Sequence, residues 1–114
     1  MPIFGNAVPE RAKMTDESIS TYLRGACSGR QNITPSATIE QALHISGNEL
    51  RRRINRLRRK GVPIASSQHG YYYAITAGEV YTTIRQLKNM ADGLAAAIHG
   101  LEDTLEHFTG GSDE

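Results

Sequence analysis

The sequence predicts a mainly α-helical protein, with three short helices and a β-hairpin followed by one long C-terminal helix. Two apolar helical patterns meet at a tight turn, His44-Ile45-Ser46. Two short extended segments then flank a turn that contains Gly70, and apolar residues recur at heptad spacing from Val80 to Phe108. At 114 residues the chain has room for one compact domain and an appendage.

The first two helices are predicted from apolar spacing and from their start signals. Asp16 is the expected N-cap of a helix that extends to about Ala26. A polar turn over residues 28–32 separates it from a second helix, with Thr34 as N-cap and Pro35 at the first helical position. Proline is favoured there because its missing N–H costs nothing.

The third helix carries the strongest local signals. Ser46 and Glu49 form an S-x-x-E pattern, which is typical of a capping box. Leu50, Ile54 and Leu57 follow at i, i+4 and i+7, and Gly61 is expected just past the helix end.

Two strands are then predicted, over residues 63–66 and 71–75, joined by a turn over residues 67–70. A second capping box, Thr76 with Glu79, opens the long helix. The order of elements is that of a winged helix-turn-helix domain. The predicted parts of the chain are a flexible arm, 1–15; a winged helix-turn-helix domain, 16–75; an oligomerisation helix, 76–108; and a disordered tail, 109–114.

A family resemblance rests on the run Ile45-Ser46 … Leu50 … Ile54 … Leu57-Arg58 … Gly61-Val62-Pro63-Ile64 … Gly70-Tyr71. This run resembles the N-terminal winged-helix domain of the biotin operon repressor type, which also occurs in small bacterial and phage or prophage regulators. The similarity covers residues 16–75, about half the chain. No segment after it has the length of a ligase domain, so the resemblance implies DNA reading by residues 46–60 and a wing at 66–70, and no biotin chemistry.

The third helix also concentrates positive charge. Seven of the thirteen basic residues lie between Arg51 and Lys60, although the net charge of the chain is only +1. Arg52 and Arg56 are like charges four residues apart, which costs stability in an isolated helix. We therefore interpret this face as a site for an anionic partner, although a solvated helix face is the simpler alternative.

The positions of these side chains on the helix suggest a division of contacts with duplex DNA. Arginine and asparagine pair with guanine and adenine edges in the major groove, and the N-terminal half of a recognition helix enters deepest. The predicted DNA-binding residues are, for base edges, Asn48, Arg51, Arg52 and Asn55; for phosphates, Arg56, Arg58, Arg59 and Lys60; and for the wing, Gln68 and His69.

The long helix has an apolar stripe that one small domain cannot bury. We expect it to pair with a second copy, most simply as a dimer, with parallel, antiparallel and four-helix arrangements left open. The predicted dimerisation residues are Ile84, Leu87, Ala91, Leu94, Ile98, Leu101, Leu105 and Phe108.

Other function classes find little support in the sequence. Cys27 is the only cysteine, and the four histidines show no metal-ligand spacing. No phosphate loop, nucleophile elbow or carboxylate pair is present, so we expect no enzyme activity, no metal and no cofactor. With no membrane-length apolar segment and no signal peptide pattern, a cytoplasmic location is expected.

The resulting functional hypothesis is a dimeric transcriptional regulator, or a phage-type accessory protein, that binds specific double-stranded DNA. Two alternatives remain open on the sequence alone. A winged helix can instead serve as a protein-interaction module in a larger complex, and a basic helix with a wing can follow an RNA backbone.

Overall fold

The computed structural model describes residues 14–108. Within them, the chain forms four α-helices, two short 3-10 helices and one antiparallel hairpin. The elements are α2 (Asp16–Ala26), η1 (Arg30–Asn32), α3 (Ser36–Leu43), α4 (Gly47–Arg59), β1 (Ile64–Ser67), β2 (Gly70–Tyr73), α5 (Ala77–Thr104) and η2 (Leu105–Phe108). The predicted mainly helical class is confirmed; most of the predicted arm and all of the predicted tail lie outside the described residues.

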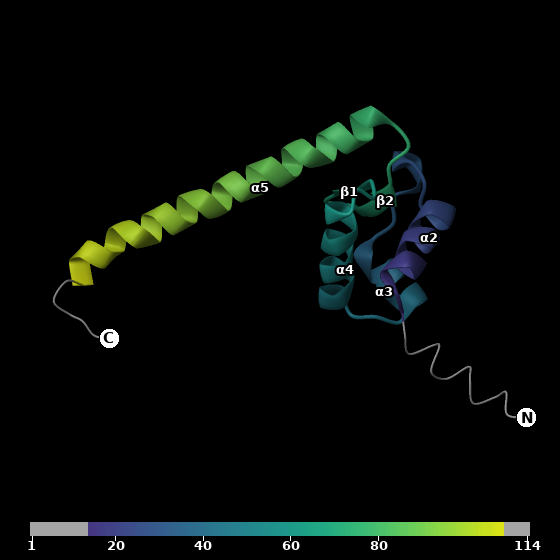
Figure 1. Cartoon of the computed structure of the whole chain (residues 1–114), viewed down its shortest axis with the longest axis horizontal. Helices are drawn as coiled ribbons and strands as arrows, with labels where there is room; N and C mark the ends of the chain where they lie inside the picture. The colour runs from purple at the N-terminus through teal and green to yellow at the C-terminus, as the bar shows by residue number, and fades with distance from the viewer. Residues whose placement is uncertain (1–13, 109–114) are drawn as a thin grey trace, which may run out of the picture. The chain divides into compact units, whose positions relative to one another are not determined.

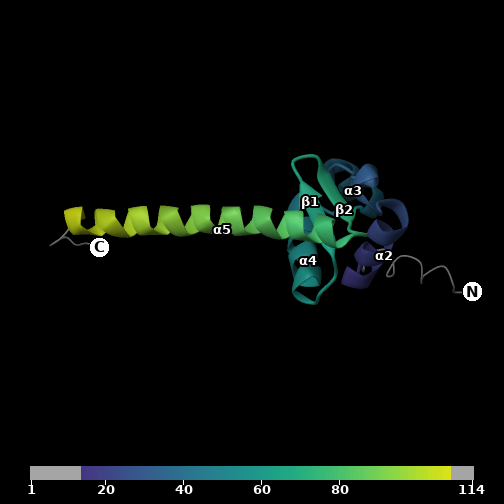
Figure 2. The ribbon, with the colours of Figure 1, turned by 90° about the horizontal axis from the view of Figure 1, so that it is seen from above.

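The chain divides into two compact units, Met1–Tyr81 and Thr82–Glu114. The first unit contains α2, α3, α4, the hairpin and the first turn of α5. Figures 1 and 2 show its three shorter helices packed together, with the hairpin beside α4. The second unit is the remainder of α5 with η2.

Two predicted helix starts are wrong by one residue. Thr15, not Asp16, is the N-cap of α2, because its Oγ1 accepts a 3.0 Å hydrogen bond from the amide of Ser18. Pro35 occupies the N-cap position of α3, where Thr34 was expected. The amide of Thr34 instead donates to the Tyr71 carbonyl at 3.0 Å, and its carbonyl accepts from the Tyr71 amide at 2.9 Å.

The turn into α4 matches its prediction. His44 adopts a left-handed conformation with φ of 58°, which reverses the chain between α3 and α4. Ser46 caps α4 through a 3.1 Å hydrogen bond from the Glu49 amide to its hydroxyl. Beyond the C-cap Lys60, Gly61 has a positive φ of 92°, as expected for a glycine just past a helix end.

Strand β2 is paired along both of its edges. One edge pairs with β1, from Ile64 opposite Tyr73 to Ser67 opposite Gly70. β1 starts one residue later than predicted, whereas β2 starts one residue earlier and ends at Tyr73 instead of residue 75. The other edge pairs with the connection between α2 and α3, through bridges at Ser28 and Thr34. This connection therefore takes the place of a third strand, although it contains only isolated bridges.

A single apolar core joins the helices and the hairpin. Its fully buried side chains come from α2, α3 and α4, and β1 and β2 close it from the sheet side. The buried residues of this core are Ile19, Leu23, Cys27, Ile39, Leu43, Leu50, Ile54, Leu57, Ile64, Ala65, Tyr72 and Ala74. The predicted inward residues of α4 are thus all buried.

The long helix α5 has 28 residues, which corresponds to about 42 Å at the usual rise per residue. The amide of Glu79 donates to Thr76 Oγ1 at 3.1 Å, as the predicted capping box requires. The Glu79 carboxylate instead accepts from the amides of Ile75 and Arg30. The predicted helix to Phe108 is wrong in its last turn, because residues 105–108 are 3-10 helix.

Replacing Gly70 with alanine should strongly destabilise the first unit. A Cβ atom at this position would lie 2.0 Å from the Thr34 carbonyl oxygen, and φ is 136°. We expect G70A to lower the free energy of unfolding by about 2–4 kcal/mol, the usual range for a severe backbone clash. Urea denaturation followed by circular dichroism measures this change.

Gly25→Ala is the matched control, because a Cβ atom at this position would have no neighbour within 4 Å and its φ is ordinary. Alanine is the better helix former, so G25A should stabilise by up to about 1 kcal/mol. Equal stability of G70A and wild type would contradict the close approach of Thr34 to β2.

Candidate nucleic-acid interface

Helix α4 separates its apolar and basic side chains onto opposite faces. Leu50, Ile54 and Leu57 are buried, whereas the polar side chains surround the remaining circumference. Exposed residues of this face are Asn48, Arg51, Arg52, Asn55, Arg59 and Lys60, and partly buried ones are Arg53, Arg56 and Arg58. All the candidate residues predicted on this helix therefore reach solvent, to different extents.

Asp16, at the start of α2, holds the basic side chains that lie nearest to α2. Its carboxylate accepts two hydrogen bonds from Arg56, at 2.8 and 3.0 Å, and one from Arg53 at 3.0 Å. Lys60 Nζ lies 4.0 Å away. The Asp16 side chain is only 15% exposed, whereas its partners Arg56 and Lys60 are 43% and 64% exposed, so the shared carboxylate is covered but the cluster lies at the surface.

The Asp16 cluster changes the ionisation of its members. The hydrogen bond from Arg56, reinforced by Arg53, lowers the pKa of Asp16 from 3.8 to about 2. The same interaction raises the pKa of the Arg56 guanidinium. Both groups therefore remain charged throughout the physiological range, and the cluster ties the start of α2 to the C-terminal half of α4.

Glu49 forms a second ion cluster within α4. Its carboxylate accepts hydrogen bonds from Arg52 and Arg53, three and four residues further along. The hydrogen bond from Arg53 is the main reason that the pKa of Glu49 is lowered. Because this carboxylate points along α4, it does not bond back to Ser46, and the capping box is formed only in its serine half.

These clusters correct the interpretation that α4 carries uncompensated repulsion. Arg52 and Arg56 each have a carboxylate partner, Glu49 and Asp16 respectively, so their side chains do not simply repel one another. From the sequence, Asp16 was expected only to cap a helix, and Arg53 was not among the predicted site residues. Spacing along the chain could not reveal the Asp16 contacts, because the partners are 37 and 40 residues apart.

Arg58 is used within the fold and does not extend freely toward solvent. Its Nε donates to the Ile64 carbonyl at 2.8 Å and its Nη2 donates to Ser66 Oγ at 3.0 Å. Burial lowers the pKa of its guanidinium. Arg58 therefore links α4 to β1 and holds the hairpin against the helix, and its predicted phosphate contact stays a prediction.

The most accessible polar side chains of α4 form what we call its outer row, which consists of Asn48, Arg51, Arg52, Asn55, Arg59 and Lys60. Arg51 Nη1 donates to Asn48 Oδ1 at 2.8 Å, so these two side chains lie together at the N-terminal half of the helix. Arg59 makes no ion pair with any residue of the described range 14–108, and Lys60 is 64% exposed. Asn55 is exposed between these two ends.

The hairpin tip presents the two predicted wing residues. Gln68 and His69 are both exposed, at the turn between β1 and β2. The amide of His69 donates to Ser67 Oγ at 3.0 Å, which stabilises the turn. The two side chains lie 3.4 Å apart, between Gln68 Nε2 and His69 Nε2, and both reach solvent.

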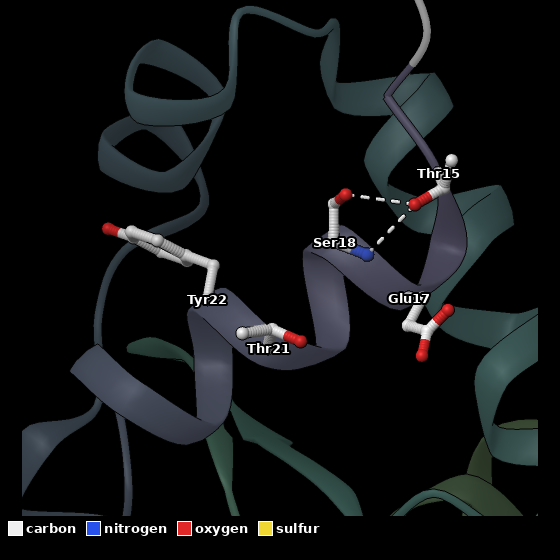
Figure 3. A pocket seen from close by; sticks show the side chains of 5 residues that line it. All are labelled: Thr15, Glu17, Ser18, Thr21 and Tyr22. Carbon is white, nitrogen blue, oxygen red and sulfur yellow. Dashed lines mark hydrogen bonds between the residues drawn. The ribbon is translucent and has the colours of Figure 1, made fainter.

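An open hollow of about 490 Å³ lies along α2 (Figure 3). It is lined by Thr15, Glu17, Ser18, Thr21 and Tyr22, all from one helix and its cap. The Ser18 hydroxyl and amide both bond to Thr15 Oγ1, so these polar groups serve the helix start. The hollow brings together no pair of groups suited to catalysis.

Large apolar side chains are exposed along α5 and η2. Leu94 and Leu101 are 67% and 68% exposed, although they belong to the predicted apolar stripe. Leu87 is partly buried, and the exposed members of the stripe are Ile84, Ala91, Leu94, Ile98, Leu101, Leu105 and Phe108. An exposed row of this kind is typical of a helix with an intermolecular partner.

Among residues 14–108, no group of three His, Cys, Asp or Glu side chains is arranged to hold a metal ion. None of the helices described there has both the length and the apolar character needed to span a membrane. No protein-family model, curated protein or solved structure matches the chain.

Asp16→Asn should remove a pH-dependent contribution to stability. Because the folded-state pKa of Asp16 is lowered, its ion pairs stabilise fully above pH 3.8 and are lost as pH falls toward about 2. At pH 7 we expect D16N to lower the free energy of unfolding by on the order of 1 kcal/mol, the scale of a charge-assisted surface cluster. Urea denaturation at a series of pH values should show the two stability curves converging near pH 2.

Glu17→Gln is the matched control for this loss of charge. Glu17 lies next to Asp16 on α2 and makes no ion pair in the described part of the chain. Its substitution should leave the free energy of unfolding within about 0.5 kcal/mol of wild type. If D16N and E17Q behave alike, the Asp16 cluster does not contribute to stability.

Proposed function

We propose that this chain is a winged helix-turn-helix protein that binds double-stranded DNA through α4, with the hairpin as its wing. The order of elements supports this class, as does the bridge of the α2–α3 connection to β2, which completes a small three-segment sheet. The resemblance to the DNA-reading domain of the biotin operon repressor type points the same way.

The observation that carries the proposal is the basic outer face of α4. Seven basic residues lie between Arg51 and Lys60, and the carboxylates that pair with them are Asp16 and Glu49. The positive charge of this face is therefore only partly neutralised. An α-helix fits the major groove, where a partly compensated basic face is attracted to both phosphates and base edges.

The contacts available to DNA follow from the restraints on each side chain. Asn48, Arg51, Arg52 and Asn55 face outward and are assigned to base edges. Arg59 and Lys60 are assigned to phosphates, and Arg56 takes part to the extent that Asp16 releases it. Gln68 and His69 would approach the neighbouring backbone or minor groove.

The exposed stripe of α5 supports self-association, with a dimer as the simplest form. Two copies would double the number of DNA contacts and bind paired half-sites. In this proposal the protein acts in the cytoplasm as a transcriptional regulator or as a phage-type accessory DNA-binding protein. It acts by occupying its site, and α4 supplies no catalytic groups.

Replacing Arg51 and Arg52 with alanine should weaken DNA binding. Fluorescence anisotropy with a labelled random-sequence duplex, at about 50–200 mM salt, measures both the affinity and its salt dependence. We expect a wild-type slope of log K against log salt near −4 or steeper, and a loss of about tenfold or more in R51A/R52A. Arg56 is left unchanged because its substitution would also break the Asp16 cluster.

The control variant R24A/R85A removes the same positive charge from α2 and α5. Arg24 lies over the ring of Tyr73, and Arg85 is exposed on α5. Its affinity should stay within about threefold of wild type. Equal losses of affinity in both variants would mean that only net charge matters. If the wild type does not bind DNA at low salt, a protein-interaction module is favoured. If it binds RNA more tightly than duplex DNA, an RNA-binding protein is favoured.

Asp16→Asn should strengthen DNA binding while it weakens the fold. Loss of the carboxylate releases Arg56 for a phosphate contact, which should steepen the salt slope by about 0.9 and raise affinity about fivefold at low salt. The same anisotropy assay at pH 7, with folding checked by circular dichroism, measures this. E17Q, with the same change in net charge, should gain less than about twofold; equal gains would argue against α4 as the interface.

A further inference from the structure

We propose that two copies of the chain pair through α5 in antiparallel orientation, with the pair centred on Ala96. This deepens the self-association in the proposed function and rests on it. Three features of α5 favour this pairing and are independent of DNA binding: the order of large and small residues in its stripe, the uneven charge along its length, and the small residues near its middle.

In the antiparallel pair, each residue of the apolar stripe lies opposite another residue of the stripe in the second copy. With Ala96 at the centre, Leu94 lies opposite Ile98 of the second copy, and Ala91 lies opposite Leu101. Leu87 and Ile84 lie opposite Leu105 and Phe108 of the second copy, in layers that include the 3-10 turn η2. Each layer then joins the two alternating positions of the heptad, as in antiparallel helix pairs.

The only small residue in the stripe between Ile84 and Phe108 is Ala91. In the antiparallel register it faces Leu101, so that a small side chain meets a large one. A parallel pair would place Ala91 against Ala91 and leave a gap between the helices, with the cost that accompanies an underpacked layer. The volumes therefore favour the antiparallel arrangement.

Charge along α5 is unevenly distributed: apart from the carboxylates Glu79 and Asp92, basic residues come early and carboxylates come late. Its basic residues, Arg85 and Lys88, lie in the first half. The C-terminal part, from Glu102 onward, carries the carboxylates Glu102, Asp103 and Glu106. A parallel pair places like charges side by side, whereas an antiparallel pair places the basic part beside the acidic part and also opposes the helix dipoles.

One ion pair between the copies follows directly from this register. Lys88 and Glu102 both flank the stripe on the same side, and in the antiparallel pair they lie about 3 Å apart along the axis. In a parallel pair they would be about 21 Å apart. Both side chains are exposed, and Glu102 has only His99 of its own helix as an ionic neighbour within the described residues, at 3.6 Å.

The middle of α5 permits close approach of the two helices. Ala95 and Ala97 flank the stripe on either side of the proposed two-fold axis, and both are exposed. Each would face its own counterpart, where bulkier side chains would separate the helices. The starts of the two α5 helices, at Ala77, would then lie about 57 Å apart along the axis.

Charge reversal tests the orientation. Sedimentation equilibrium of the full chain gives the dimer dissociation constant for K88E, for E102K and for the double variant K88E/E102K. Each single variant creates two repulsive pairs and should weaken the dimer about tenfold, whereas the double variant should return to within about threefold of wild type. In a parallel dimer the two changes would not compensate, and that result would overturn the proposal.

Asp103→Lys is the matched control for E102K. Asp103 carries the same charge one residue further along, but on the side of α5 opposite to the stripe, so its reversal should change the dissociation constant less than about threefold. Equal effects of D103K and E102K would overturn the Lys88–Glu102 pairing. A monomeric wild type would instead overturn the self-association itself, and a tetramer would overturn the two-copy arrangement.

Disulfide trapping gives a second, geometric readout. In the antiparallel pair, A91C and L101C lie opposite each other, whereas two copies of either variant place their thiols about 15 Å apart, beyond disulfide reach. A covalent dimer should form when the variants are refolded together and oxidised, and not from either alone. Cross-linking of the single variants would show parallel pairing, and wild type controls for the buried Cys27.

Discussion

The surface of the first unit depends on one constraint, namely that the backbone of β2 is hydrogen-bonded along both edges. On one edge β2 holds β1, and on the other it holds the α2–α3 connection through the backbone of Thr34, the Cys27 carbonyl and the Gly29 amide. Gly70 is required where β2 meets Thr34, since any side chain would collide with that carbonyl. The hairpin therefore cannot move independently of the helices, and a wing built on it keeps its place beside α4.

Within the first unit, internal carboxylates determine which basic side chains remain available to a ligand. Asp16 orients Arg53 and Arg56 toward α2, and Arg58 is drawn to the hairpin backbone. The outer row, from Asn48 to Lys60, is left to meet solvent. A long arginine side chain that is already held in place loses less conformational freedom on binding. The internal pairs therefore preorganise Arg53, Arg56 and Arg58, which lie beside the outer row.

Much of the fold could be predicted because its signals are local. The heptad spacing of α5, the serine cap of α4 and Gly61 after its end are all set by neighbouring residues, and each was predicted correctly. The start of α2 was wrong by one residue, although its signal, the bond from the Ser18 amide to Thr15, is local. The start of α3 was also wrong, because Thr34 is taken by a strand 37 residues later and its backbone partners cannot be read from adjacent positions. The same limit applied to the candidate site. The basic face was predicted from spacing, whereas the roles of Asp16 and Arg58 depend on contacts between distant segments.

The nearly neutral net charge of the chain conceals two parts of opposite sign. Residues 1–81 contain eleven basic and six acidic residues, whereas residues 82–114 contain two basic and six acidic ones. By charge alone, a polyanion attracts the first part and repels the second, which agrees with the proposal that DNA binds to α4 and that the apolar stripe of α5 meets a different partner. The acidic end of α5 finds its nearest complement in the basic first half of the same helix. In the antiparallel pairing that we propose, a second copy would supply that complement and would also bury the stripe.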